Sequence, residues 1–142
     1  MTVAAAAPTS PTLTGTIRAC LREDLPDVTR LFDVAFFHGP GQRLPKLEAY
    51  LTDLFFDAPC QADSLLHSYV HEDADGRVGG FIGTHPRSFI FEHRPITAAA
   101  YGQLMVHPDL RGRGIARELC RKFYDGGQVF GLGTTASRTK GI

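Results

Sequence analysis

Cysteine is scarce in this sequence and is not arranged for cross-linking or metal binding. The three cysteines, Cys20, Cys60 and Cys120, are odd in number, far apart and without a C-x-x-C pair. This pattern indicates neither a disulfide framework nor a zinc site, and reduced thiols in a cytoplasmic protein are the plain interpretation. His67 and His71 would share a strand face, but four residues of strand separate them by about 13 Å, too far to chelate one ion. We therefore expect no bound metal.

The sequence also lacks an excess of charge of either sign. Fifteen Lys and Arg residues balance fifteen Asp and Glu residues, so no overall field favours nucleic acid or an anionic membrane as a partner. No apolar run approaches the roughly 20 residues that a membrane-spanning helix needs. The Ala4–Ala7 tract has neither the basic flank nor the apolar segment of a secretory signal. The sequence therefore predicts neither a nucleic-acid partner nor a membrane partner.

The 142 residues of the chain match the length of a single domain. Residues 1–15 are rich in Ala, Pro, Ser and Thr, and they cannot bury enough apolar surface to offset the entropy lost on ordering. We predict a disordered tail over residues 1–15 and a domain over residues 16–142.

The periodicity of apolar residues predicts a mixed α/β domain. Strands are expected at residues 16–20, 65–72, 77–84, 88–91, 96–106 and 128–132, and helices at residues 25–37, 44–55 and 115–124. The turn residues Asp73 to Gly76 indicate a hairpin, and Pro86 indicates an irregularity after the third strand. Three glycines within that strand indicate either a bend or the close approach of another backbone or a ligand. The order of elements is not a repeated βαβ unit.

The most informative stretch runs from Gln103 to Tyr124. It predicts the end of a buried strand, a tight Pro/Asp turn, a glycine-punctuated arginine loop and an amphipathic helix. Ile115, Leu119 and Phe123 recur at four-residue spacing, which places them on one face of that helix.

The charges at the start of this helix do not match its position. The first turn of a helix carries roughly half a positive charge, and each cation there is disfavoured by about 0.3–1 kcal/mol. Arg111, Arg113 and Arg117 nevertheless gather at this end. Gly112 and Gly114 would let the backbone come close to an anion that offsets them. The pattern predicts a cradle for a phosphate or pyrophosphate.

Alternative interpretations of this loop are a solvated turn and other nucleotide-binding motifs. In the first, Asp109 and Glu118 partly neutralise the arginines, and the glycines serve only the turn. A Rossmann loop fits less well, because G-x-G-x-x-G would require glycine at Arg117. A P-loop is excluded because no G-K-[ST] follows the turn.

Val106-His107-Pro108, followed by Arg111-x-x-Gly114-x-Ala116, resembles the acetyl-CoA signature of the GNAT superfamily of N-acetyltransferases. The signature of that family is [R/Q]-x-x-G-x-[G/A] between its fourth strand and third helix. The resemblance covers residues 16–133 and lacks the C-terminal helix and final strand pair of the family. It implies an α/β fold with a mixed, mostly antiparallel central sheet flanked by helices.

The resemblance also implies a reaction and a donor site. Acetyl-CoA would be the donor and an amine of a small molecule or peptide the acceptor, joined by direct attack in a ternary complex. Backbone groups of the strand would bind the pantetheine arm, and the loop would surround the pyrophosphate. The residues implied are Leu104, Met105, Val106, Arg111, Gly112, Arg113, Gly114, Ile115 and Ala116, with Arg111 and Gly114 ranked first.

Catalytic residues are harder to assign from the resemblance. Family members often use an acidic base on the fourth strand, but strand 96–106 contains none. Tyr101 and Gln103 are its polar groups, and strand parity predicts that they share one face. Gln103 can orient a water but cannot abstract a proton. His107, Glu72 and His85 are possible bases, although each of these residue types at such positions is more often structural.

Two alternatives to an active enzyme follow from these gaps. The missing base and missing C-terminal helix fit a module of the same fold that binds acyl-CoA without turnover. The open sheet edge fits a structural fragment that pairs with another chain, as in a homodimer.

Overall fold

A five-stranded sheet forms the centre of the computed structural model, which describes residues 13–59, 66–126 and 130–133. Its strands are β1 (Thr16–Ala19), β2 (Tyr69–Glu72), β3 (Val78–Phe91), β4 (Arg94–Val106) and β5 (Phe130–Gly133). They are ordered as they occur in the chain, and all neighbours are antiparallel except β4 and β5. The predicted α/β class with a mostly antiparallel sheet is therefore confirmed.

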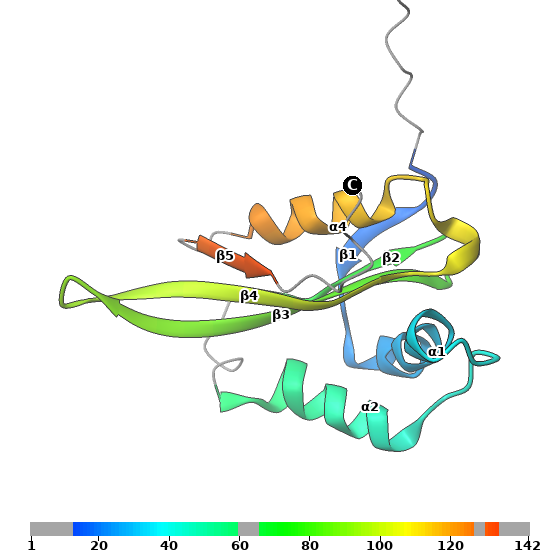
Figure 1. Ribbon diagram of the computed structural model, residues 1–142, viewed down its shortest axis with the longest axis horizontal. Helices are drawn as coiled ribbons and strands as arrows, with labels where there is room; N and C mark the ends of the chain where they lie inside the picture. The colour runs from blue at the N-terminus through cyan, green and yellow to red at the C-terminus, as the bar shows by residue number, and fades with distance from the viewer. Residues whose placement is uncertain (1–12, 60–65, 127–129, 134–142) are drawn as a thin grey trace, which may run out of the picture.

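Helices cover both faces of this sheet (Figure 1). One face carries α1 (Leu25–Phe36), preceded by the short η1 (Arg22–Asp24), and α2 (Pro45–Thr52), continued by the π-helical turn η2 (Asp53–Asp57). The other face carries α4 (Ile115–Tyr124), which follows the turn η3 (Pro108–Leu110). No helix within the described ranges is long and apolar enough to cross a membrane.

Each face of the sheet has its own apolar core. The core beneath α1 and α2 is formed by Cys20, Leu25, Val28, Leu31, Leu51, Phe55, Val70, Phe81 and Met105. The core beneath α4 is formed by Leu66, Ile82, Ala99, Val106, Ile115, Leu119 and Phe123. Neighbouring residues of β4, Met105 and Val106, serve opposite cores, so this strand is buried on both faces where it leads into the loop.

Strands β3 and β4 form one long hairpin whose end projects from the body as an arm (Figure 1). The irregularity predicted at Pro86 is absent, since β3 continues through it and Pro86 pairs with Ala99. The described pairing with β2 reaches only to Ile82, so Pro86 lies where β3 has an open edge and a missing N–H is tolerated. Glu92 and His93, with φ of 48° and 63°, make the tight turn at the tip.

The predicted tail falls mostly outside the described residues, which begin at Leu13. Its last residues contact the domain, because Leu13 packs against the α4 core and the Thr14 carbonyl oxygen lies 2.7 Å from His71 Nε2. Cys60 and residues 128–129 of the last predicted strand also lie outside the described ranges.

Candidate functional site

The turn after β4 is fixed by His107. Its backbone N–H donates to the Gly79 carbonyl oxygen at 2.9 Å, and its Nδ1 accepts from the Asp109 N–H at 3.2 Å. The ring therefore caps η3. His107 lines a cavity of 240 Å³ on the side of α1 and β3, apart from the cavity described below. These contacts account for His107 as a turn residue.

Two glycines set the path of the arginine loop. Gly112 and Gly114 have φ of 79° and 82°, a conformation that residues with a Cβ rarely adopt. Helix α4 begins directly after Gly114 and has no side-chain cap. Its first intrahelical bond joins the Glu118 N–H to the Gly114 carbonyl oxygen at 3.1 Å. The preceding N–H groups of the first turn are thus available to an external acceptor.

The arginines of this loop differ in their surroundings. Arg117 and Arg121 both pair with Glu118, so the predicted neutralisation by Glu118 applies to Arg117. Arg111 Nε lies 3.3 Å from the Val106 carbonyl oxygen, which holds this side chain against the end of β4. In the part of the chain that the structure describes, neither Arg111 nor Arg113 forms an ion pair. An unneutralised positive charge therefore remains at the uncapped helix terminus.

A cavity of 360 Å³ opens beside this terminus. Its walls come from the end of α1, the end of β4, the loop and the start of α4. They consist of Ala35, Phe36, Leu104, Met105, Val106, Leu110, Arg111, Gly112, Gly114, Ile115 and Ala116. Of the residues predicted to bind the donor, all but Arg113 line this cavity. Ala35 and Phe36 were missed, because a helical apolar stripe is equally well explained by core packing.

The last part of β4 is open along the edge that borders this cavity. Parallel pairing with β5 runs from Ala98 and Phe130 to Tyr101 and Gly133 and ends there in the described residues. Within the described ranges, backbone groups of β4 beyond Tyr101 have no strand partner on that side. The cavity thus combines an apolar wall, free strand backbone and a positive helix terminus. Such a site suits an elongated ligand with an apolar or amide-containing arm and an anionic end.

A β-bulge interrupts β4 next to this cavity. Phe81 pairs with Met105, but Gly83 pairs with Gly102, so Ile82 alone faces two residues of β4, Gln103 and Leu104. Gln103 has φ of 49°, which is unusual for a residue that is not glycine. Its Oε1 is buried and makes no well-formed hydrogen bond among the described residues.

The bulge overturns the prediction that Tyr101 and Gln103 share a face. Tyr101 packs against α4, with ring centroids 5.1 Å from Phe123 and 6.3 Å from Tyr124, and burial raises its pKa. Gln103 instead contacts His85, which lies on the α2 side. The parity argument assumed a regular strand, and one extra residue reverses it.

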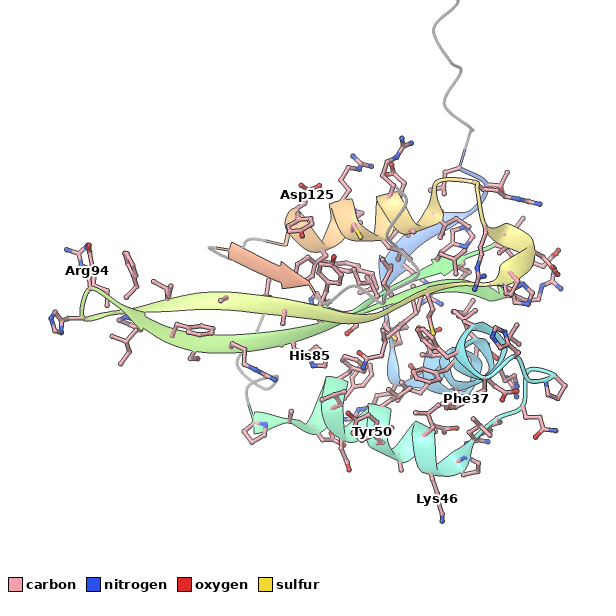
Figure 2. All side chains as sticks on the ribbon, in the orientation of Figure 1. Phe37, Lys46, Tyr50, His85, Arg94 and Asp125 are labelled. Carbon is pink, nitrogen blue, oxygen red and sulfur yellow. The ribbon has the colours of Figure 1, made fainter. Side chains whose placement is uncertain are left out.

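His85 occupies the α2 face of the sheet directly beside the bulge (Figure 2). It is half-buried, and its ring lies 4.9 Å from the Phe55 ring, centroid to centroid. Burial lowers the pKa of His85, the Gln103 side chain opposes this shift as a hydrogen-bond partner, and the charge of Arg87 adds to it. A Cβ on Gly102 would lie 3.3 Å from His85 Nε2, so this nitrogen faces the glycine of the bulge.

Glu72, another base suggested by the sequence, belongs to an ion-pair network. Its Oε2 accepts from Arg18 Nε at 2.6 Å on the neighbouring strand β1, and strand β3 separates its own strand β2 from β4. His67 precedes β2. The buried His71 forms a hydrogen bond through Nε2 with the Thr14 carbonyl oxygen. No cluster of potential metal ligands occurs in residues 13–59, 66–126 and 130–133.

Comparisons with known proteins match this architecture. The model of the Acetyltransferase (GNAT) family matches residues 25–135. A putative acetyltransferase from Agrobacterium tumefaciens is 18% identical with a TM-score of 0.61, and the match covers 86% of this chain and 82% of that one. A GNAT family N-acetyltransferase from Escherichia coli, in complex with CoA, is 23% identical with a TM-score of 0.57, over 84% of this chain and 59% of that one.

A third structure, glucosamine-6-phosphate N-acetyltransferase from Arabidopsis thaliana, is 12% identical with a TM-score of 0.65. That match covers 90% of this chain and 86% of the plant enzyme. At these identities the structural likeness establishes the shared fold alone. A sequence search of curated proteins finds no match.

Proposed function

Because the chain belongs to the GNAT acetyltransferase family, we propose that it moves an acetyl group from acetyl-CoA to an amine of a small molecule or a peptide. The transfer is a direct attack in a ternary complex. The observation that carries this proposal is the cavity along the open edge of β4, which ends at the uncapped, positively charged start of α4.

The residues of this cavity fit the chemical parts of the donor. The N–H groups from Gly112 to Ala116 suit the pyrophosphate, because amides at a helix start bind anions. Arg113 adds an exposed positive charge with no ion pair in the described chain. The open backbone of Leu104, Met105 and Val106 suits the amide-containing pantetheine arm. When bound, acetyl-CoA supplies an activated acyl thioester.

The remaining task of the protein is to provide a neutral amine. An amine with a pKa of about 10.4 is neutral for less than one part in a thousand at pH 7, which adds about 4–5 kcal/mol to the barrier. Protein groups must therefore lower the amine pKa or accept its proton. The alternative function, a module that binds acyl-CoA without turnover, is favoured by the absence of an acidic residue from β4.

The test is release of the CoA thiol from acetyl-CoA across a panel of small amines and short peptides. If the proposed transfer occurs, turnover should depend on both substrates, and mass spectrometry should detect the N-acetylated product. Binding of CoA without turnover for every amine supports the module. Failure to bind CoA at millimolar concentration contradicts both functions.

A further inference from the structure

The bulge of β4 brings together two side chains to which the proposed reaction has not yet given a task. We propose that Gln103 and His85 form the acceptor-amine site. In this site, Gln103 Oε1 accepts a hydrogen bond from the amine and His85 Nε2 takes the amine proton. The inference rests on the proposed acetyl transfer and identifies the group that makes the acceptor nucleophilic.

Gln103 has two features that cost folding free energy and that packing does not explain. Its φ of 49° is strained for a residue with a side chain, and such strain gathers at functional positions. Its carboxamide oxygen is buried without a well-formed hydrogen bond in the described chain, although the side chain is a hydrogen-bond partner of His85. An amine N–H that donates to this oxygen completes its hydrogen bonding. The carboxamide cannot itself take the proton.

His85 has the properties required of a proton acceptor at neutral pH. The contact with Phe55 and the surrounding sheet bury the ring, and this burial lowers the pKa of His85. The neutral ring therefore predominates at pH 7. Gly102, which has no side chain, lies close to Nε2, and a Cβ at this position would be only 3.3 Å from that nitrogen. The ring is thus flanked by the bulge on one side and by η2 on the other (Figure 2).

The charged groups near His85 do not supply an alternative base. Arg87, two residues along β3, disfavours the protonated ring through its positive charge. On η2, Asp53 is exposed and the Asp57 carboxylate is paired with Arg22. Tyr101 lies on the opposite face of the sheet, against α4. Among these neighbours, the His85 imidazole is the group best suited to accept a proton at neutral pH.

The location fits attack from the α2 face on a donor that lies along the edge of β4. The amine nitrogen bonds to the acetyl carbon as the carbon–sulfur bond breaks, and the sulfur leaves with the electron pair as a thiolate. The amine proton goes to His85 Nε2, from which it returns to solvent or to the thiolate. Atoms and charge balance without a further reactant.

The decisive variant is His85→Gln, which keeps a polar side chain but cannot take a proton. We expect kcat/KM for the amine to fall at least about 100-fold, the usual contribution of general base catalysis, while the Kd for CoA stays unchanged. His93→Gln, at the exposed tip of the arm, is the matched control and should keep the wild-type rate. A His85→Gln enzyme with wild-type kcat/KM contradicts the inference.

The pH profile provides a readout that a structural role would not change. Below the His85 pKa both the amine and the histidine must lose a proton, so log kcat/KM of the wild type should rise with a slope of two. Above that pKa the slope should be one, and His85→Gln should show a slope of one throughout. A change of slope that persists in His85→Gln, or a variant profile identical to that of the wild type, contradicts the inference.

Gln103→Gly separates substrate binding from stability. Glycine accepts the positive φ, so the variant should be at least as stable as the wild type, while KM for the amine should rise about tenfold with little change in the Kd for CoA. An unchanged KM argues that the buried carboxamide does not meet the amine. Absence of turnover by the wild type contradicts the proposed transfer, and with it the inference of an acceptor site.

Discussion

Arg18 links β1 to both the start of α1 and the neighbouring strand. Its guanidinium donates to the two Asp24 carboxylate oxygens at 2.7 and 2.8 Å and to Glu72 at 2.6 Å. Asp24 also accepts from the Leu21 N–H at 2.8 Å. Burial alone would raise the pKa of Asp24, but the bonds from Arg18 and Leu21 outweigh it and lower that pKa.

Asp24→Asn should therefore reduce the free energy of unfolding at pH 7. Breaking a buried pair costs about 3–5 kcal/mol, and we expect about 2 kcal/mol because 34% of the Arg18 side chain is exposed. The folded pKa of Asp24 is depressed, so its contribution is present above the unfolded pKa of about 3.9 and is lost as pH falls through the folded pKa.

Urea denaturation of wild type and Asp24→Asn at pH 7 and pH 3 measures this linkage. The difference between the two proteins should shrink at pH 3. Asp27→Asn is the control, because its exposed pair with Arg30 should contribute less than about 1 kcal/mol. An equally large difference at both pH values would exclude the titration of Asp24 as its source.

The glycines of β3 allow helices and loops to approach the sheet. A Cβ on Gly79 would lie 2.4 Å from Leu110 Cδ1, and one on Gly80 would lie 2.9 Å from Ile115 Cγ2. On the other face, a Cβ on Gly83 would lie 2.3 Å from Phe55 Cζ. The closest atoms to these three glycines belong to side chains, and the Gly102 carbonyl oxygen also lies within 3.2 Å of where a Cβ on Gly83 would be.

Gly83→Ala should destabilise the protein by about 1–3 kcal/mol, the usual cost of overpacking. The added methyl must displace Phe55, which also contacts Phe81 and His85. Ser88→Ala, at an exposed position of the same strand, should change stability by less than about 0.5 kcal/mol. Chemical denaturation compares the two variants. Equal midpoints would show that Phe55 moves aside without a loss of stability.

The sequence predicted the features of the fold that are local and missed those that depend on contacts between distant residues. The cavity beside the start of α4 was predictable because most of its wall lies between Leu104 and Ala116, where strand, loop and helix follow one another. Phe36 joins that wall only because α1 packs beside β4. The partnership of His85 with Gln103 was also missed, because a bulge changes which side chains meet and leaves no signature in apolar periodicity.

Binding of CoA should stabilise the entire fold, since the cavity joins α1, β4 and α4. A ligand at a hundredfold excess over its Kd adds about 2.7 kcal/mol. For a domain of this size, that corresponds to a rise in Tm of about 8 °C. Differential scanning fluorimetry at increasing CoA concentration measures the rise, and a Tm independent of CoA would contradict it.

We expect the start of α4 to hold the anionic part of CoA. Gly112 and Gly76 offer a matched pair, because their φ angles are 79° and 78° and a Cβ on either would meet nothing within 4 Å. Glutamate at both positions thus imposes the same backbone strain, but only Gly112→Glu places a negative charge at the helix terminus. Calorimetric titration with CoA should give Gly76→Glu the wild-type Kd and weaken Gly112→Glu at least tenfold. Equal affinities of the two variants, or no binding by the wild type, would contradict the account.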